Sequence, residues 1–164
     1  MMNRRKFLVG LGVATAATII PSSLSAVDFR ATKPAAFTAH KIDEAMTALF
    51  GTSVTTKGQV KIKAPSIAEN GSVVPITVSS KLAGRTVAIF QDANPESTVA
   101  VLTVPEGGII DYGVRIKLAK TGTVTAVVDV DGKLYSASKL VKVTAGGCGG
   151  WFNHPLANRK IKHK

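Results

Sequence analysis

Hydrophobic and polar residues alternate over most of the chain between residues 59 and 144. In the first such run Val60 and Ile62 fall on one side of an extended backbone, and Lys61 and Lys63 fall on the other. Runs of this kind, rich in Val, Ile and Thr and bounded by Gly, Pro, Asn or Asp, predict β-strands. They occupy residues 59–64, 73–79, 86–91, 98–104, 109–118, 123–130 and 134–144.

A different period precedes the strands. Ile42, Ala45, Met46 and Leu49 recur at the spacing of one helical face, which predicts an amphipathic helix over residues 35–50 that ends at Gly51. We expect this helix to pack on the rest of the domain. Residues 27–34 are expected to form an irregular lead-in.

Turn residues separate the predicted strands at short intervals. The strongest signal is Asp131-Gly132, a dipeptide typical of a tight hairpin, between two alternating runs. Further turns are expected at 70–71, 94–95, 105–108 and 120–122. The pattern predicts an all-β fold with one N-terminal helix, an immunoglobulin-like antiparallel β-sandwich. The cysteine pair of antibody domains is absent, because the sequence holds one cysteine.

The N-terminus resembles an export signal. Arg4 and Arg5 precede an uncharged stretch that is too short to span a bilayer, and small residues follow near position 25. Paired arginines favour the Tat route and hence the periplasm. The chain is therefore expected to comprise a Tat signal peptide (1–26), one sandwich domain that includes the helix (27–145), a glycine-rich arm (146–150) and a basic tail (151–164).

Charge adds little to this picture. The formal net charge is +11, and removal of the leader takes away three of the 21 basic residues, which leaves 18 against 10 acidic ones and a net charge of +8. Four of these 18 basic residues and no acidic residue lie in the tail, so the domain itself carries a net charge of only +4. Aromatic residues that could stack on bases are few. We expect neither nucleic-acid binding nor stable membrane association.

The candidate chemistry lies in the only cysteine of the chain. Cys148 is flanked by Gly146, Gly147, Gly149 and Gly150. These neighbours have no side chains to pack against a thiol and leave the backbone free to adopt many conformations. A lone cysteine in an exported protein implies an intermolecular bond or a reactive thiol. The sequence predicts an exposed thiol on a flexible arm directly after the last strand.

Residues 131–144, continuing through Ala145 into Gly-Gly-Cys-Gly-Gly, resemble the C-terminal part of the SoxY family. Residues 64–71 and 74–78, the twin-arginine leader and the helix before the strands are also similar to that family. The resemblance implies a periplasmic carrier, itself not an enzyme and without a cofactor, that holds thiosulfate-derived sulfur covalently on Cys148. It also implies a stable heterodimer with a SoxZ subunit.

The resemblance further implies transient partners that act in turn on the attached sulfur. A c-type haem enzyme (SoxAX) would couple thiosulfate to the cysteine, and SoxB would hydrolyse the terminal sulfone to sulfate. A sulfane dehydrogenase of the SoxCD type would oxidise the remaining sulfur. The glycines around Cys148 would form a swinging arm, and no acid–base pair is expected beside the thiol.

The tail departs from the family pattern, in which chains typically stop near the cysteine. Fourteen residues follow Gly150 here, beginning Trp151-Phe152. The tail could be trimmed after export, fold aside over an exposed surface, or belong to a variant with more open partner sites. We expect its removal to leave sulfur loading intact or faster.

Other functions remain open on the sequence. Cys148, His154 and His163 are possible copper or zinc ligands, although the arm offers no scaffold to hold them together, and we expect no metal site. His40 lies on the predicted helix and is expected at the surface. The alternative to a carrier is an exported structural or metal-binding immunoglobulin-like module that dimerises through Cys148.

Overall fold

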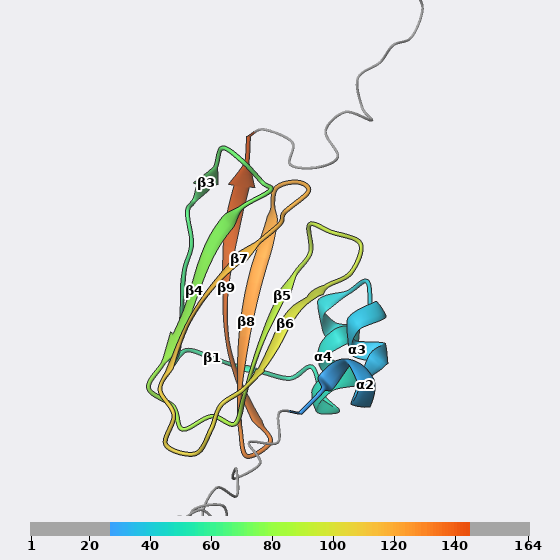
Figure 1. Cartoon of the computed structure of the whole chain (residues 1–164), viewed down its shortest axis with the longest axis vertical. Helices are drawn as coiled ribbons and strands as arrows, with labels where there is room; N and C mark the ends of the chain where they lie inside the picture. The colour runs from blue at the N-terminus through green and yellow to red at the C-terminus, as the bar shows by residue number, and fades with distance from the viewer. Residues whose placement is uncertain (1–26, 145–164) are drawn as a thin grey trace, which may run out of the picture.

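The computed structural model describes residues 27–144, in which three short helices precede two β-sheets (Figure 1). The helices are α2 (Phe29–Thr32), α3 (Pro34–Thr38) and α4 (Ile42–Phe50). The strands are β1 (Thr56–Lys57), β2 (Val60–Lys63), β3 (Ile67–Ala68), β4 (Val74–Ser80), β5 (Thr86–Gln91), β6 (Thr98–Thr103), β7 (Ile110–Ile116), β8 (Gly122–Val130) and β9 (Lys133–Val143).

The helical segment differs from the prediction of one helix over residues 35–50. It forms two helices, α3 and α4, because the backbone is extended at Ala39 (ψ 136°) and at Lys41 (ψ 145°). The break lets the carbonyl of Ala39 accept a hydrogen bond from the Ser97 N–H at 2.9 Å. A tertiary hydrogen bond thus overrides a helical pattern. The predicted end at Gly51 is confirmed, in the left-handed conformation (φ 81°).

The expected irregular lead-in before residue 35 is also wrong in part. Residues 29–32 form α2, because the Asp28 carboxylate accepts hydrogen bonds from the N–H groups of Arg30 (3.0 Å) and Ala31 (3.1 Å). An acidic cap of this kind satisfies N–H groups that have no partner inside the helix.

The two sheets confirm the all-β prediction. The larger sheet has the order β1-β9-β8-β5-β6, with β3 also paired to β9, and the smaller one has the order β2-β4-β7. Each of the predicted strands is present with ends that shift by at most two residues. The predicted antiparallel pairing holds for the longer strands, whereas the short strands β1 and β3 pair with β9 in parallel. Two-residue strands are too short to show an alternating pattern.

The predicted hairpin joins β8 to β9. Asp131 (φ 51°) and Gly132 (φ 85°) both have positive φ, as a type I′ turn requires, and Val130 pairs with Lys133. The Gly132 N–H also donates to the Asp129 carboxylate at 2.8 Å. Local sequence therefore sets the register of the two longest strands.

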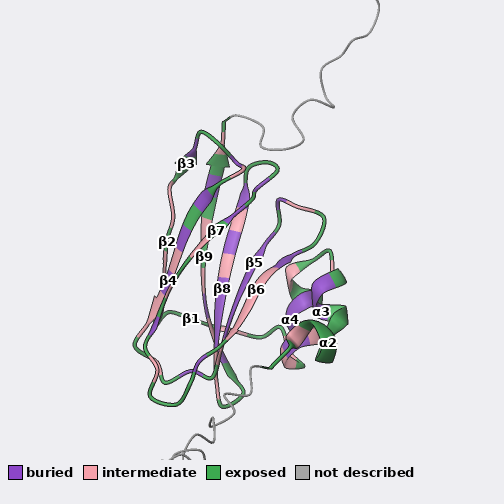
Figure 2. Ribbon diagram, in the orientation of Figure 1, coloured by how far each residue is buried: buried purple, intermediate pink, exposed green. Residues whose placement is uncertain are grey.

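Buried hydrophobic residues form two layers, one on each face of the larger sheet. Figure 2 shows buried positions in the strands and in the helices. Val87 and Ile89 of β5 point between the sheets, where they join Val78 and Val128 in the main core. Phe90 belongs to the second layer, between the sheet and the helices. The other buried members of this layer are Ala36, Phe37, Ala45, Met46, Leu49, Ala88, Val127 and Leu134. Strand β5 is therefore covered on both faces.

Among residues 27–144, no helix is long and apolar enough to cross a membrane.

Candidate functional site at the end of the last strand

Strand β9 directs the chain toward the candidate cysteine. It is the longest described strand, and it pairs with β8 from Lys133 to Val141. On its other side it pairs with β1 through Tyr135 and Ser136 and with β3 through Lys142 and Val143. The strand therefore lies inside the larger sheet rather than at a free edge (Figure 1).

Hydrogen bonds hold this strand up to the last described residue. The Lys142 N–H donates to the Ser66 carbonyl (3.0 Å), and the Thr144 N–H donates to the Ala68 carbonyl (3.1 Å). Between them, the Val143 N–H donates to the hydroxyl of Thr121 (3.0 Å). The backbone is thus anchored on both sides four residues before Cys148.

The predicted site residues themselves lie outside the described part of the chain. Cys148 and its glycines at 146, 147, 149 and 150 follow residue 144, and so does the tail of residues 151–164. The leader, residues 1–26, also lies outside the described residues. The described structure places the base of the arm, and the arm remains a prediction from sequence.

The 92–97 loop, between β5 and β6, lies at the same end of the sandwich as the base of the arm. The fully buried Gln91 accepts hydrogen bonds from the N–H groups of Ala93 (2.6 Å) and Asn94 (2.7 Å) and donates to the carbonyl of Glu96 (2.5 Å). Its side chain satisfies backbone groups of the 92–97 loop that no strand partner reaches. The loop therefore has a fixed shape.

The 92–97 loop in turn binds the loop between β7 and β8. The Asn94 side chain donates to the Lys117 carbonyl (2.8 Å) and accepts from the Ala119 N–H (2.9 Å), and the Asp92 carboxylate accepts from the Thr123 N–H (2.6 Å). Thr121, whose hydroxyl accepts the Val143 N–H of β9, belongs to the loop between β7 and β8. The Asn94-Pro95 turn signal predicted the 92–97 loop from sequence, but no local pattern indicated the hydrogen bonds between the two loops.

Gln91 makes a testable contribution to this arrangement. We expect Gln91→Leu to lower the free energy of unfolding by about 3 kcal/mol, because it leaves three buried or half-buried backbone groups without a partner. Urea unfolding followed by circular dichroism measures the change. Replacement of the exposed Glu96 by Gln keeps the carbonyl that Gln91 contacts and should change stability little; an equal loss in both variants would contradict this role of Gln91.

His40 was expected on the helix surface, and it is exposed but lies between α3 and α4. Its Nδ1 is 2.7 Å from the carbonyl of Pro95 and must be the donor, because a carbonyl only accepts. His40 therefore serves to link the helices to the 92–97 loop. Within residues 27–144, no three His, Cys, Asp or Glu side chains gather as metal ligands. His154 and His163 lie outside the described residues.

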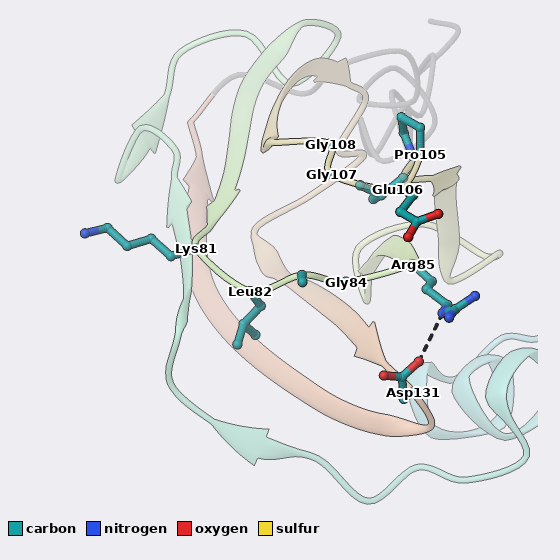
Figure 3. A pocket seen from close by; sticks show the side chains of 11 residues that line it. Lys81, Leu82, Gly84, Arg85, Pro105, Glu106, Gly107, Gly108 and Asp131 are labelled. Carbon is teal, nitrogen blue, oxygen red and sulfur yellow. Dashed lines mark hydrogen bonds and ion pairs between the residues drawn. The ribbon is translucent and has the colours of Figure 1, made fainter.

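A hollow of about 470 Å³ lies at the opposite end of the sandwich (Figure 3). Lys81, Arg85, Glu106 and Asp131 contribute its charged groups, and the Arg85 guanidinium is 3.0 Å from the Asp131 carboxylate. Asp131 lies in the hairpin turn, two residues before β9 begins at Lys133, so the length of that strand separates the hollow from the base of the arm. Both side chains of the ion pair are more than 70% exposed, at 79% and 75%. The hollow is therefore not a part of the candidate site.

The fold and the site together define a β-sandwich protein with a helical layer on one face and, in its sequence, a lone cysteine just beyond the last strand. A family model described as sulfur oxidation protein SoxY matches residues 46–148, so the match includes Cys148 and ends there. The match covers more than half of the chain. The chain belongs to the SoxY family, whose members carry sulfur and are not enzymes.

One solved structure agrees with this assignment. The sulfur carrier protein SoxY from Chlorobium limicola f. thiosulfatophilum is 39% identical, with a TM-score of 0.59, over 64% of this chain and 97% of that one. A superoxide reductase (neelaredoxin) from Ignicoccus hospitalis is 20% identical, with a TM-score of 0.48, over 53% of this chain and 81% of that one. No curated protein matches the chain.

Proposed function

We propose that this protein carries thiosulfate-derived sulfur covalently on Cys148 in the bacterial periplasm. The observation that carries the proposal is the position of the only cysteine, four residues beyond a strand that is hydrogen-bonded up to Thr144, in a chain of the SoxY family. A firmly held strand gives the arm a fixed origin. The glycines on either side of the thiol would let it enter the sites of other proteins.

The chemistry requires two steps that balance as follows. The Cys148 thiolate and thiosulfate form a sulfur–sulfur bond, with loss of two electrons to a haem enzyme of the SoxAX type. Water then attacks the terminal sulfone, so that sulfate and two protons leave and a persulfide stays on the cysteine. A SoxB-type hydrolase would perform the second step, and a SoxCD-type dehydrogenase would oxidise the persulfide further.

The carrier needs only to present its thiol for these reactions. Covalent attachment keeps a reactive intermediate at a high effective concentration near each enzyme. The sandwich, including the partner surface for a SoxZ subunit, would stay outside the enzyme cleft. The four residues from Thr144 to Cys148 can extend at most about 13–14 Å, which sets the depth that the thiol can reach.

Intact-mass measurement tests the proposal directly. After incubation with thiosulfate and the partner enzymes, we expect a mass increase that corresponds to a thiosulfonate or persulfide, localised to Cys148 by peptide mapping and removed by a thiol reductant. Arg85→Ala, in the hollow at the far end of β9, is the matched control and should load normally. A protein whose mass does not change under these conditions would contradict the carrier role.

Export is tested on the same protein. We expect the purified chain to lack its leader, with cleavage after Ser25 or Ala26, and to appear in the periplasmic fraction. Replacement of Arg4 and Arg5 by lysine should retain it in the cytoplasm with the leader attached. Periplasmic export of that variant at the normal level would rule out the Tat route.

A further inference from the structure

An exposed apolar patch lies beside the base of the arm. Ile67 of β3 is 58% exposed and Leu140 of β9 is 53% exposed. Ile67 pairs with Lys142, and Leu140 precedes that residue by two, so Ile67 and Leu140 are diagonal neighbours on one face of the larger sheet. With a strand spacing of about 4.8 Å and two residues of about 3.3 Å, their Cα atoms are about 8 Å apart.

The face that carries this patch is the one on which the helices pack. Leu134 belongs to the hydrophobic layer under the helices, and Leu140 follows it by six residues, which returns to the same side of a strand. The helices lie beside β5 and β6 and leave the far end of β9 uncovered (Figure 1). Val141, between the exposed Leu140 and Lys142, points into the core instead.

We propose that the C-terminal tail, residues 151–164, docks on this patch with the side chains of Trp151, Phe152 and Leu156. The arm would then form a loop closed at both ends, with Cys148 at its tip, rather than a free chain end. This inference goes beyond the proposed function, because the docking can be measured in the isolated protein without any sulfur chemistry.

The length of chain beyond the described residues fits this geometry. Leu140 lies four residues, or about 13 Å, before Thr144 along β9. The seven residues from Thr144 to Trp151 can extend at most about 23–25 Å, and they include all the glycines of the arm. A chain reversal there allows Trp151 to lie over Leu140. Closing so short a glycine-rich loop has a modest entropic cost.

The chemistry of the tail matches the surface that it would cross. Its first six residues include three large apolar side chains and no Lys, Arg, Asp or Glu, which suits the apolar patch beside Lys142. Its four basic residues come later, from position 159 onward. The acids on the helix side of the sheet include Asp43 of α4 and Glu96 of the adjoining loop, while Glu44 already pairs with Lys41 at 3.4 Å. Three strand spacings, about 14 Å, separate β9 from β6, which the tail can span.

Trp151 is the only tryptophan of the chain, so its fluorescence reports on the tail alone. In the reduced full-length mature protein we expect blue-shifted emission and slower acrylamide quenching than in a synthetic peptide of residues 151–164. The Ile67→Ser/Leu140→Ser double variant should shift both properties toward those of the peptide. Ile109→Ser removes an apolar residue that is 83% exposed and follows Gly108 of the hollow at the opposite end, and it should change neither.

Alkylation of Cys148 gives a second measurement. We expect the thiol to react severalfold faster in the Ile67→Ser/Leu140→Ser variant and in a chain that ends at Gly150, because a closed loop restricts approach to the sulfur. Ile67 and Leu140 are both exposed, so the circular dichroism spectrum of the double variant should equal that of the wild-type protein.

Four results would each overturn the proposal. The first two are peptide-like emission of Trp151 in the wild-type protein and a protected Trp151 that the double variant leaves unchanged. The third is loss of protection on dilution, which would assign the contact to a second copy of the chain. The fourth is an intact mass that shows the tail to be absent from the mature protein. None of them bears on whether Cys148 accepts sulfur.

Discussion

Replacing Cys148 with serine is expected to abolish thiosulfate loading and to reduce thiosulfate-dependent sulfate release by the reconstituted enzymes to background. The chain contains no other cysteine, so no second thiol can take over. A serine hydroxyl does not ionise near neutral pH and is a poor nucleophile toward sulfur, whereas the thiolate is the reactive form of cysteine. Sulfate release, measured by ion chromatography, and intact mass report the two effects.

The same substitution should leave the fold unchanged. Position 148 lies beyond the strands whose packing stabilises residues 27–144, so the melting temperature of Cys148→Ser should equal that of the wild-type protein. Arg85→Ala again serves as the control that keeps normal turnover. Undiminished sulfate release with Cys148→Ser would refute the covalent carrier mechanism.

The largest expected effect on stability belongs to Phe90. We expect Phe90→Ala to lower the free energy of unfolding by about 3–5 kcal/mol, the usual cost of removing a buried aromatic ring and leaving a cavity. Phe90 of β5 is 0% exposed and belongs to the same buried cluster as Phe37, Met46 and Leu49 of the helices. Its loss should therefore weaken the attachment of the helical layer.

Urea unfolding measured by circular dichroism gives this change. The matched control is Ile109→Ala, at a side chain that is 83% exposed, and its effect should stay within about 0.5 kcal/mol. Hydrogen exchange should increase first in α3 and α4 of Phe90→Ala. Equal destabilisation by the two variants would show that the helices contribute little to the folded state.

The strands and their principal turn could be predicted because their signals are local. Alternation of apolar and polar residues places side chains on two faces of a strand, and Asp131-Gly132 has the conformational preferences of a type I′ turn. The hydrophobic period of α4 and its end at Gly51 are equally local. The identity of the single thiol also needed no structure, since it rests on composition and on neighbouring glycines.

The break between α3 and α4 could not be predicted in the same way. It depends on contacts with residues more than fifty positions away, such as the 2.7 Å hydrogen bond from His40 to Pro95. The parallel pairing of β1 and β3 with β9 also depends on residues far apart in the sequence. Thr55 and Ser136, whose hydroxyls lie 2.8 Å apart beside β1, are separated by 81 residues.

By itself, the sequence determined the strand pattern, the hairpin before the last strand and the position of the single cysteine. Only the tertiary structure decided how the base of the arm is held, through β3, Thr121 and the loop bonded to Gln91 and Asn94. The physical reason is that alternation and turn preference depend on neighbouring residues. A hydrogen bond between loops depends on which segments the folded sheets bring together.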